Sequence, residues 1–185
     1  MLMARSMALH LATLLSSSLA ATGCAHDAAL PKGQVIEYEA SAEIDAPPEL
    51  VWATLVEFQA YAQWNPWLVE AEQLGPLEPG AGVNAKVRLG DEPLRTAKHR
   101  VVRVEAPAVL CWRDAGWQVG LVQAQRCRFL EARADGGTSL RVTLTLGGAA
   151  RGMAVRKYGA AMSEGLASET AALAAEAERR AGAPP

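Results

Sequence analysis

The segment Ala46–Trp67, which reads APPELVWATLVEFQAYAQWNPW, constrains the fold more than any other part of the chain. It starts at two prolines, continues as a short pattern typical of a helix and ends in Trp-Asn-Pro-Trp, so that it holds three of the five tryptophans. Tryptophan buries a large area and carries one N–H that needs an acceptor. An aromatic surface of this size in one short segment can be buried only against a large concave surface. The function depends on what that concave surface encloses.

Length and composition indicate a single folded domain. The chain has 185 residues, of which 50% are hydrophobic, so it can bury a real core, and its main body is not expected to be disordered. The formal net charge is −2, and lysine and arginine form no run. The sequence therefore lacks the basic surface that nucleic-acid-binding proteins use, and we expect no nucleic-acid partner.

The first residues have the pattern of an export signal. Arg5 precedes a mostly apolar run from Met7 to Ala20, which is too short to span a membrane and has the length of a secretory signal. We therefore expect residues 1–23 to be a signal peptide and the protein to be exported.

The end of this signal resembles the lipobox of bacterial lipoproteins. Residues 19–24 read LAATGC, although Ala21 stands where those proteins usually have Leu, Val or Ile. The resemblance implies cleavage after Gly23, lipidation of Cys24 and a membrane anchor facing the periplasm or cell exterior, with 24–34 as a tether. Cleavage by the ordinary signal peptidase is the alternative.

The remaining chain begins with a strand and short helices. Alternating side chains predict the strand over Val35–Ile44, and Asp45 can cap the helix that follows. The helical pattern breaks at Asn65-Pro66, because a residue before proline avoids the helical region. Apolar runs bounded by turn residues predict six further strands, over 67–74, 83–89, 95–105, 109–114, 121–132 and 138–146.

A long amphipathic helix is predicted over Gly152–Ala181. Residues at helical spacing form its apolar face: Val155, Tyr158, Met162, Leu166, Thr170, Leu173 and Ala177. Charged residues supply much of the rest: Arg151, Arg156, Lys157, Glu164, Glu169, Glu176, Glu178, Arg179 and Arg180. The order predicts an α+β domain in which this helix covers the apolar face of an antiparallel sheet, with a cavity between them where the sheet curves.

Cys111 and Cys127 flank a predicted hairpin and would lie almost opposite each other. In an exported protein they could form a disulfide, since opposed strand residues are within its reach. The other arrangement is two buried free thiols, which we prefer because packing alone can bury either strand. The predicted domain has one histidine, and its spacing from these cysteines matches no zinc pattern, so we expect no metal and no cofactor.

Four segments keep the content and order of one known superfamily: APPELVW, FQAYAQWNPW, VVRVEAPAVLCWR and RFLEARADGGT. Together they resemble the START-like (Bet v 1-like) superfamily, in particular its polyketide cyclase/dehydrase-like SRPBCC branch, over residues 35–181, with 182–185 as a tail. The resemblance implies a helix-grip fold: a curved antiparallel sheet of about six to seven strands around a long C-terminal helix, with two short helices after the first strand. It also implies a deep hydrophobic pocket.

The same resemblance places eight side chains around that pocket, at its rim, on the sheet and on the long helix. They are Trp64, Asn65, Trp67, Trp112, Phe129, Tyr158, Met162 and Leu166. For each of them the alternative is that it only fills the core. Trp117, at a predicted hairpin tip, is either a rim or membrane-facing residue or an ordinary exposed loop residue.

The domain offers few catalytic groups. His99 lies between Lys98 and Arg100, whose charges oppose its protonation, and we expect it to be solvated. No serine has an evident histidine partner, so a catalytic triad is not expected. Polar groups that could act within a pocket are Tyr158, Asn65, Arg113 and Arg128.

The two arginines of this set, Arg113 and Arg128, are expected to lie near each other across the hairpin. There they could receive an anionic head group or be solvated on the exterior of the sheet.

Three functions compete. The first is a lipid-anchored protein that binds a small hydrophobic molecule or lipid between helix and sheet. The second is a polyketide cyclase or dehydratase-like enzyme, which only the family branch favours and which an export signal disfavours. The third is a non-catalytic interaction module with a filled core. The lack of an acid–base set favours the first.

Overall fold

The computed structural model describes residues 35–115 and 121–182. The predicted signal peptide, the tether with Cys24, and Trp117 lie outside the described residues. The elements follow one another as β1 (Ile36–Ile44), α1 (Pro48–Val56), η1 (Phe58–Ala60), α2 (Tyr61–Trp64), β2 (Leu68–Leu74), β3 (Gly82–Val87), β4 (Arg95–Glu105), β5 (Val109–Asp114), β6 (Gln123–Ala132), β7 (Thr138–Gly147) and α3 (Arg151–Ala181).

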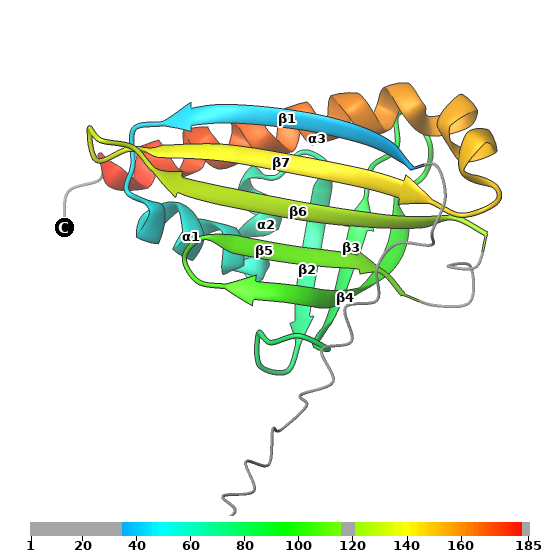
Figure 1. Ribbon diagram of the computed structural model, residues 1–185, viewed down its shortest axis with the longest axis horizontal. Coiled ribbons are helices and arrows are strands. Elements are labelled where there is room, and N and C mark those ends of the chain that lie inside the picture. Colours follow the sequence, from blue (N-terminus) through cyan, green and yellow to red (C-terminus); the bar gives the residue numbers. More distant parts are fainter. Residues whose placement is uncertain (1–34, 116–120, 183–185) are drawn as a thin grey trace, which may run out of the picture.

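All seven strands form one antiparallel sheet in the order β1-β7-β6-β5-β4-β3-β2. Figure 1 shows α3 running along β1 and β7, while β2 and β3 cross those strands steeply, so that the sheet bends around the helix. The predicted α+β helix-grip fold is therefore confirmed, including the two short helices after the first strand. No helix in the described ranges combines the length and the apolar character needed to cross a bilayer.

The first strand shows why the sheet has one covered face. Its glutamates and serine are exposed, while the alternate residues, which include Tyr38 and Ala40, pack against the core. This period of two places one row of side chains against α3 and the other in solvent. The last residue of β1, Ile44, is completely buried.

The short helix α1 begins differently from the prediction. Its N-cap is Pro47, and no side chain caps the helix, so the predicted role of Asp45 is wrong. The two prolines separate Asp45 from the first turn, and neither has an N–H to be capped. The carboxylate of Asp45 instead lies 3.4 Å from Nη1 of Arg133. Pro48 occupies the first turn of the helix, where its fixed φ is tolerated.

The sheet carries two separate apolar clusters. The large one fills the space between the sheet, α3 and the short helices, and it includes Trp67, Trp112 and Leu166. The small one lies on the opposite face, where Val109, Cys111 and Cys127 are buried. We call these the inner and the outer face. The inner face positions the candidate site.

Candidate functional site

The aromatic segment turns the chain into the sheet at Asn65. Oδ1 of Asn65 accepts hydrogen bonds from the backbone N–H groups of Trp67, at 3.0 Å, and Leu68, at 2.8 Å. These bonds fix the turn after α2 and direct Trp67 inward, where only 3% of it is exposed. Asparagine suits this position because its short side chain bonds readily to the backbone just after it. Asn65 therefore has a structural role, which sequence reasoning did not assign to it.

Trp67 packs against α3 where the helix has a glycine. A Cβ built on Gly165 would lie 2.5 Å from the indole atoms Cδ2, Cε2 and Nε1 of Trp67. That is closer than real Cβ contacts come, so the missing side chain of Gly165 lets the indole reach the helix backbone. The contact joins the aromatic segment to the middle of α3.

Most of the other predicted pocket residues lie on the inner face. Trp112, Met162 and Leu166 are buried in the large cluster, and Trp64 and Tyr158 are partly buried against it. Phe129 was placed wrongly. It is directly opposite Val109 in the β5–β6 register and packs in the small cluster of the outer face, under the guanidinium of Arg141 at 4.2 Å.

The centre of the inner face holds three buried charges, which we call the ionic triad: Arg126, Arg128 and Glu169. Nη1 of Arg126 donates to Oε2 of Glu169 at 2.8 Å, and Nη2 of Arg128 donates to Oε1 of the same carboxylate. Arg128 is completely buried, and Glu169 is 2% exposed. Buried charges are rare in proteins unless they are paired, so this triad is the most unusual feature of the interior.

Tryptophan rings flank both guanidiniums. The guanidinium carbon of Arg126 lies 3.8 Å from the ring centroid of Trp67, and that of Arg128 lies 4.0 Å from the ring of Trp112. Contacts of this kind attract a cation to the negative face of the ring. Two predicted pocket residues therefore meet two charged groups that arrive from β6.

Sequence reasoning named Arg128 as a polar group of the pocket but missed the other two members of the triad. It assigned Glu169 to the charged side of the long helix, although Glu169 lies between Leu166 and Leu173 at spacings of three and four, the spacing of one helix face. Arg126 was not singled out, although it shares the alternation of Ala124 and Leu130 along β6. The spacing of Glu169 on the helix and of Arg126 on the strand indicated burial. Charged residues are seldom buried, so neither was assigned to the interior.

The pairing expected for Arg113 and Arg128 is wrong. In the register, Arg113 lies opposite Gln125, whereas Arg128 lies opposite Leu110. Successive residues of a strand face opposite sides, so Arg128 belongs to the inner face and Arg113 to the outer one.

His99 is not solvated, in contrast to the prediction. Its side chain is 9% exposed and its ring centroid lies 5.7 Å from that of Trp112. Burial, together with the positive charges of Arg126 and Arg128, lowers the pKa of His99 to about 3. The imidazole is therefore neutral at pH 7.

The other groups of the interior keep their ordinary charge at pH 7. Burial lowers the pKa of Arg126 to about 10, which leaves it cationic. For Glu169 burial acts to raise the pKa, but the two guanidiniums outweigh it and hold the pKa below its usual value. Burial raises the pKa of Tyr61, which donates its hydroxyl to the carbonyl of Leu55 and stays neutral.

Several buried nitrogens of the inner face and the adjoining aromatic segment have no hydrogen-bond partner within the described residues. Six of them are N–H donors, and the seventh is Nδ1 of His99. The donors are Trp64 Nε1, Asn65 Nδ2, Trp67 Nε1, Arg126 Nε, Arg128 Nε and Arg128 Nη1. Buried polar groups are nearly always paired, because an unpaired one loses about 1–3 kcal/mol of hydration. The inner face thus offers donors without acceptors.

The β3–β4 loop is tied to the start of α3. Oε1 of Glu92 lies 3.2 Å from Nζ of Lys157, and Arg95 stacks 5.2 Å from the ring of Tyr158. Tyr158 therefore lies under a cluster of exposed charges at one end of the helix. In the described part of the chain, the cations over its ring are Arg95 and Lys157, which are not members of the ionic triad.

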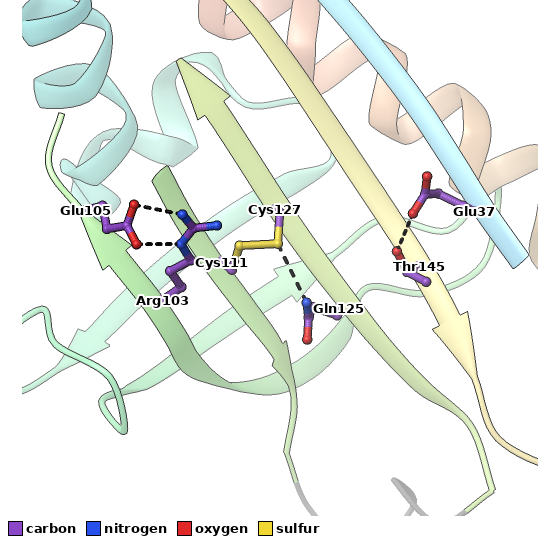
Figure 2. Close-up of a disulfide and its surroundings, with 7 residues drawn as sticks. All are labelled: Glu37, Arg103, Glu105, Cys111, Gln125, Cys127 and Thr145. Carbon is purple, nitrogen blue, oxygen red and sulfur yellow. Dashed lines mark hydrogen bonds and ion pairs between the residues drawn. A yellow bond between two sulfur atoms is a disulfide. The ribbon is translucent and has the colours of Figure 1, made fainter. Parts of the chain in front are cut away.

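Cys111 and Cys127 are joined by a disulfide, which links β5 to β6 on the outer face (Figure 2). Of the two arrangements open from the sequence, the structure has the one that was not preferred. Directly opposed residues of an antiparallel pair approach closely, and the Cα atoms here are 4.1 Å apart. Nε2 of Gln125 donates to Sγ of Cys127 at 3.7 Å.

A surface pocket of about 520 Å³ lies elsewhere, at the start of α3. Its lining comprises Val35, Ile36, Ala149, Arg151 and Gly152, and it includes none of the predicted pocket residues. In the described ranges, no group of three or more His, Cys, Asp or Glu side chains is arranged to hold a metal ion.

Comparisons with known proteins agree with this architecture. A family model described as polyketide cyclase / dehydrase and lipid transport matches residues 35–178. No curated protein matches the chain.

Solved structures of the same fold include the Zhui aromatase/cyclase from Streptomyces sp. R1128, which is 21% identical with a TM-score of 0.60, covering 81% of this chain and 98% of that one. Ara h 8.0201 is 16% identical with a TM-score of 0.58, covering 78% and 98%. The di-domain ARO/CYC BexL from the BE-7585A biosynthetic pathway is 16% identical with a TM-score of 0.59. There the match covers 82% of this chain but only 51% of the relative, so the chain spans about half its length. At these identities the similarity shows the fold.

Proposed function

The chain belongs to the polyketide cyclase/dehydrase and lipid transport family, the SRPBCC (Bet v 1-like) proteins, and we propose that it binds a small hydrophobic molecule or lipid between its sheet and α3. One observation carries this proposal: six buried N–H donors have no acceptor within the described residues. A core that only holds the fold together gains nothing from such donors, since each loses hydration without a return. A guest with acceptor atoms satisfies them.

Binding requires the interior to open. Trp67, Trp112 and the ionic triad fill the space at the centre of the inner face, and all five side chains are nearly or completely buried. The β3–β4 loop is tied to α3 by an exposed ion pair of Glu92 with Lys157, and a pair of this kind contributes little to stability. We infer that a ligand enters at this tie, by separating the loop from the helix.

Two observations support an exported and lipid-anchored protein. The N-terminal pattern of the chain has a signal-like apolar run that ends in Gly23-Cys24. The disulfide between Cys111 and Cys127 is of the kind that persists in oxidising compartments outside the cytoplasm. With Cys24 lipidated, the binding domain would work at a membrane surface, next to a supply of apolar molecules.

Catalysis is the second candidate. An enzyme of this family would need polar groups inside the domain, and buried charged groups do lie there. The charge states favour binding over acid–base chemistry. His99 has a pKa of about 3 and Glu169 a pKa below its usual value, so neither exchanges a proton near neutral pH. The third candidate is an interaction module with a filled core. It does not explain why these buried donors lack acceptors.

Native mass spectrometry tests the proposal. Protein produced with its signal peptide and purified without detergent should carry an added mass that organic solvent extracts, besides any mass at Cys24. Extracted protein should then bind the neutral apolar dye N-phenyl-1-naphthylamine, with energy transfer from the tryptophans of the inner face. A bare polypeptide mass together with no dye binding would contradict the proposal.

A further inference from the structure

We propose that the ligand carries one anionic head, a carboxylate, which binds at the unpaired edges of Arg126 and Arg128. This inference rests on the proposed function and names the chemistry of its ligand. It starts from the ionic triad, in which two guanidiniums share the one carboxylate of Glu169. Two positive charges against one negative charge leave one positive charge in excess.

The neighbours of the triad do not remove this excess. His99 and Tyr61 are neutral at pH 7, as shown above. Asp114 attracts Arg126, but its side chain is 34% exposed and its carboxylate already accepts from the backbone N–H of Ala124 at 2.9 Å. Burial raises the pKa of Asp114. Its carboxylate lies 3.6 Å from Nε2 of the neutral His99 and forms no ion pair with either guanidinium within the described residues, so it balances the buried charge only in part.

The tryptophans do not supply the missing charge either. Trp67 and Trp112 lie against the faces of the two guanidiniums, where their rings offer a quadrupole and no formal charge. Stacking on the faces leaves the edges of the guanidiniums available. Those edges carry the unpaired donors Nε of Arg126 and Nε and Nη1 of Arg128.

A carboxylate meets these requirements. Its single negative charge matches the excess, and its two oxygens can accept from one unpaired N–H of each guanidinium, since Glu169 already takes the Nη2 of Arg128 that a bidentate fork would use. Nε1 of Trp67 and Nδ2 of Asn65 add further unpaired donors on the same inner face. The apolar cluster around them suits a hydrocarbon body, so the ligand is an amphipathic acid.

A matched pair of ligands tests this inference. The exported protein, stripped of ligand, is titrated with dodecanoic acid and with dodecanol at pH 8, followed by tryptophan fluorescence and calorimetry. The acid should bind about 10- to 100-fold more tightly, the range expected for charge-assisted hydrogen bonds. Equal affinity for acid and alcohol would overturn the carboxylate head while leaving the proposed function intact. Binding of neither compound would contradict the proposed function itself.

Variants locate the head group. Arg126→Gln and Arg128→Gln should each bring the affinity for the acid down to that for the alcohol, without weakening the alcohol. Arg141→Gln is the matched control, because this arginine stacks on Phe129 on the outer face and should leave both affinities unchanged. Selective binding of the acid that survives in both inner variants would overturn the placement. The ligand comparison on the unaltered protein decides the head group even where a variant does not fold.

Discussion

At the scale of single residues, the interior depends on a few side chains whose surroundings restrict what they can be. Gly165 has no room for a Cβ beside Trp67, the ring of His99 lies 5.7 Å from that of Trp112, and Glu169 pairs with both buried arginines. Each can be changed separately, and each change reports a different property of the inner face.

The variant Gly165→Ala should destabilise the domain by about 1–3 kcal/mol, because the new methyl group meets the indole of Trp67 at 2.5 Å. Urea unfolding measures the change. Gly152→Ala is the control: the same substitution in the same helix, with open space around the new Cβ, should be neutral or stabilise by up to about 1 kcal/mol. Equal effects of the two variants would show that Trp67 does not lie against the helix.

His99 should make stability depend on pH. Its pKa is about 3 in the folded state, against 6.5 for a free imidazole, so between these values the unfolded chain binds the extra proton. Stability is therefore complete above pH 6.5 and falls by about 1.4 kcal/mol per pH unit as the pH drops toward 3. Urea unfolding at pH 7.5 and pH 5 measures this loss, which His99→Gln should reduce by about 2 kcal/mol. A variant with the same pH dependence as the unaltered protein would refute the buried, neutral His99.

At the scale of elements, the sequence predicted strands and helices well and their faces less well. The bounds of β4 and β5 match the predicted ranges, since turn residues mark both ends. In β6 both faces are half apolar: Cys127 and Phe129 point one way, Ala124 and Leu130 the other. Alternation alone does not decide which face of such a strand is buried, so Phe129 was assigned to the pocket and Arg126 was missed.

The link between β5 and β6 should contribute measurably to stability. Cys111 and Cys127 are 16 residues apart, and closing a loop of that length stabilises a fold by about 3 kcal/mol. Adding a reductant should lower the free energy of unfolding by about this amount. The double variant Cys111→Ala/Cys127→Ala should already have the lower value and should not respond to reductant. An unaltered protein that is indifferent to reductant would argue for free thiols.

At the scale of the whole molecule, the fold followed from the sequence, and the content of its interior did not. The order of elements and the apolar face of α3 predict a bent sheet closed by one helix, which the structure has. A deep apolar pocket was expected from resemblance, whereas the inner face is filled by tryptophans and an ionic triad. What fills an interior depends on how side chains pack in three dimensions, and the spacing of residues along the chain does not specify that packing.

The proposed membrane anchor concerns the whole chain, because it depends on the N-terminal residues before the domain. Cys24→Ser should release the protein from the membrane fraction into the soluble periplasmic or extracellular fraction, because lipidation needs the thiol. Fractionation with immunodetection measures the distribution, and Ser41→Ala, an exposed residue of β1 far from the signal and with the thiol intact, is the control. Membrane retention of the Cys24→Ser protein would contradict lipid anchoring.

A crystal structure of the protein with bound dodecanoate tests the central claim most directly. We predict density for the ligand between β6 and α3, with its carboxylate within hydrogen-bond distance of Arg126 and Arg128 and with Trp67 displaced from Gly165. Density only in the surface pocket beside Ile36 and Arg151, with the inner face filled as it is here, would contradict the account.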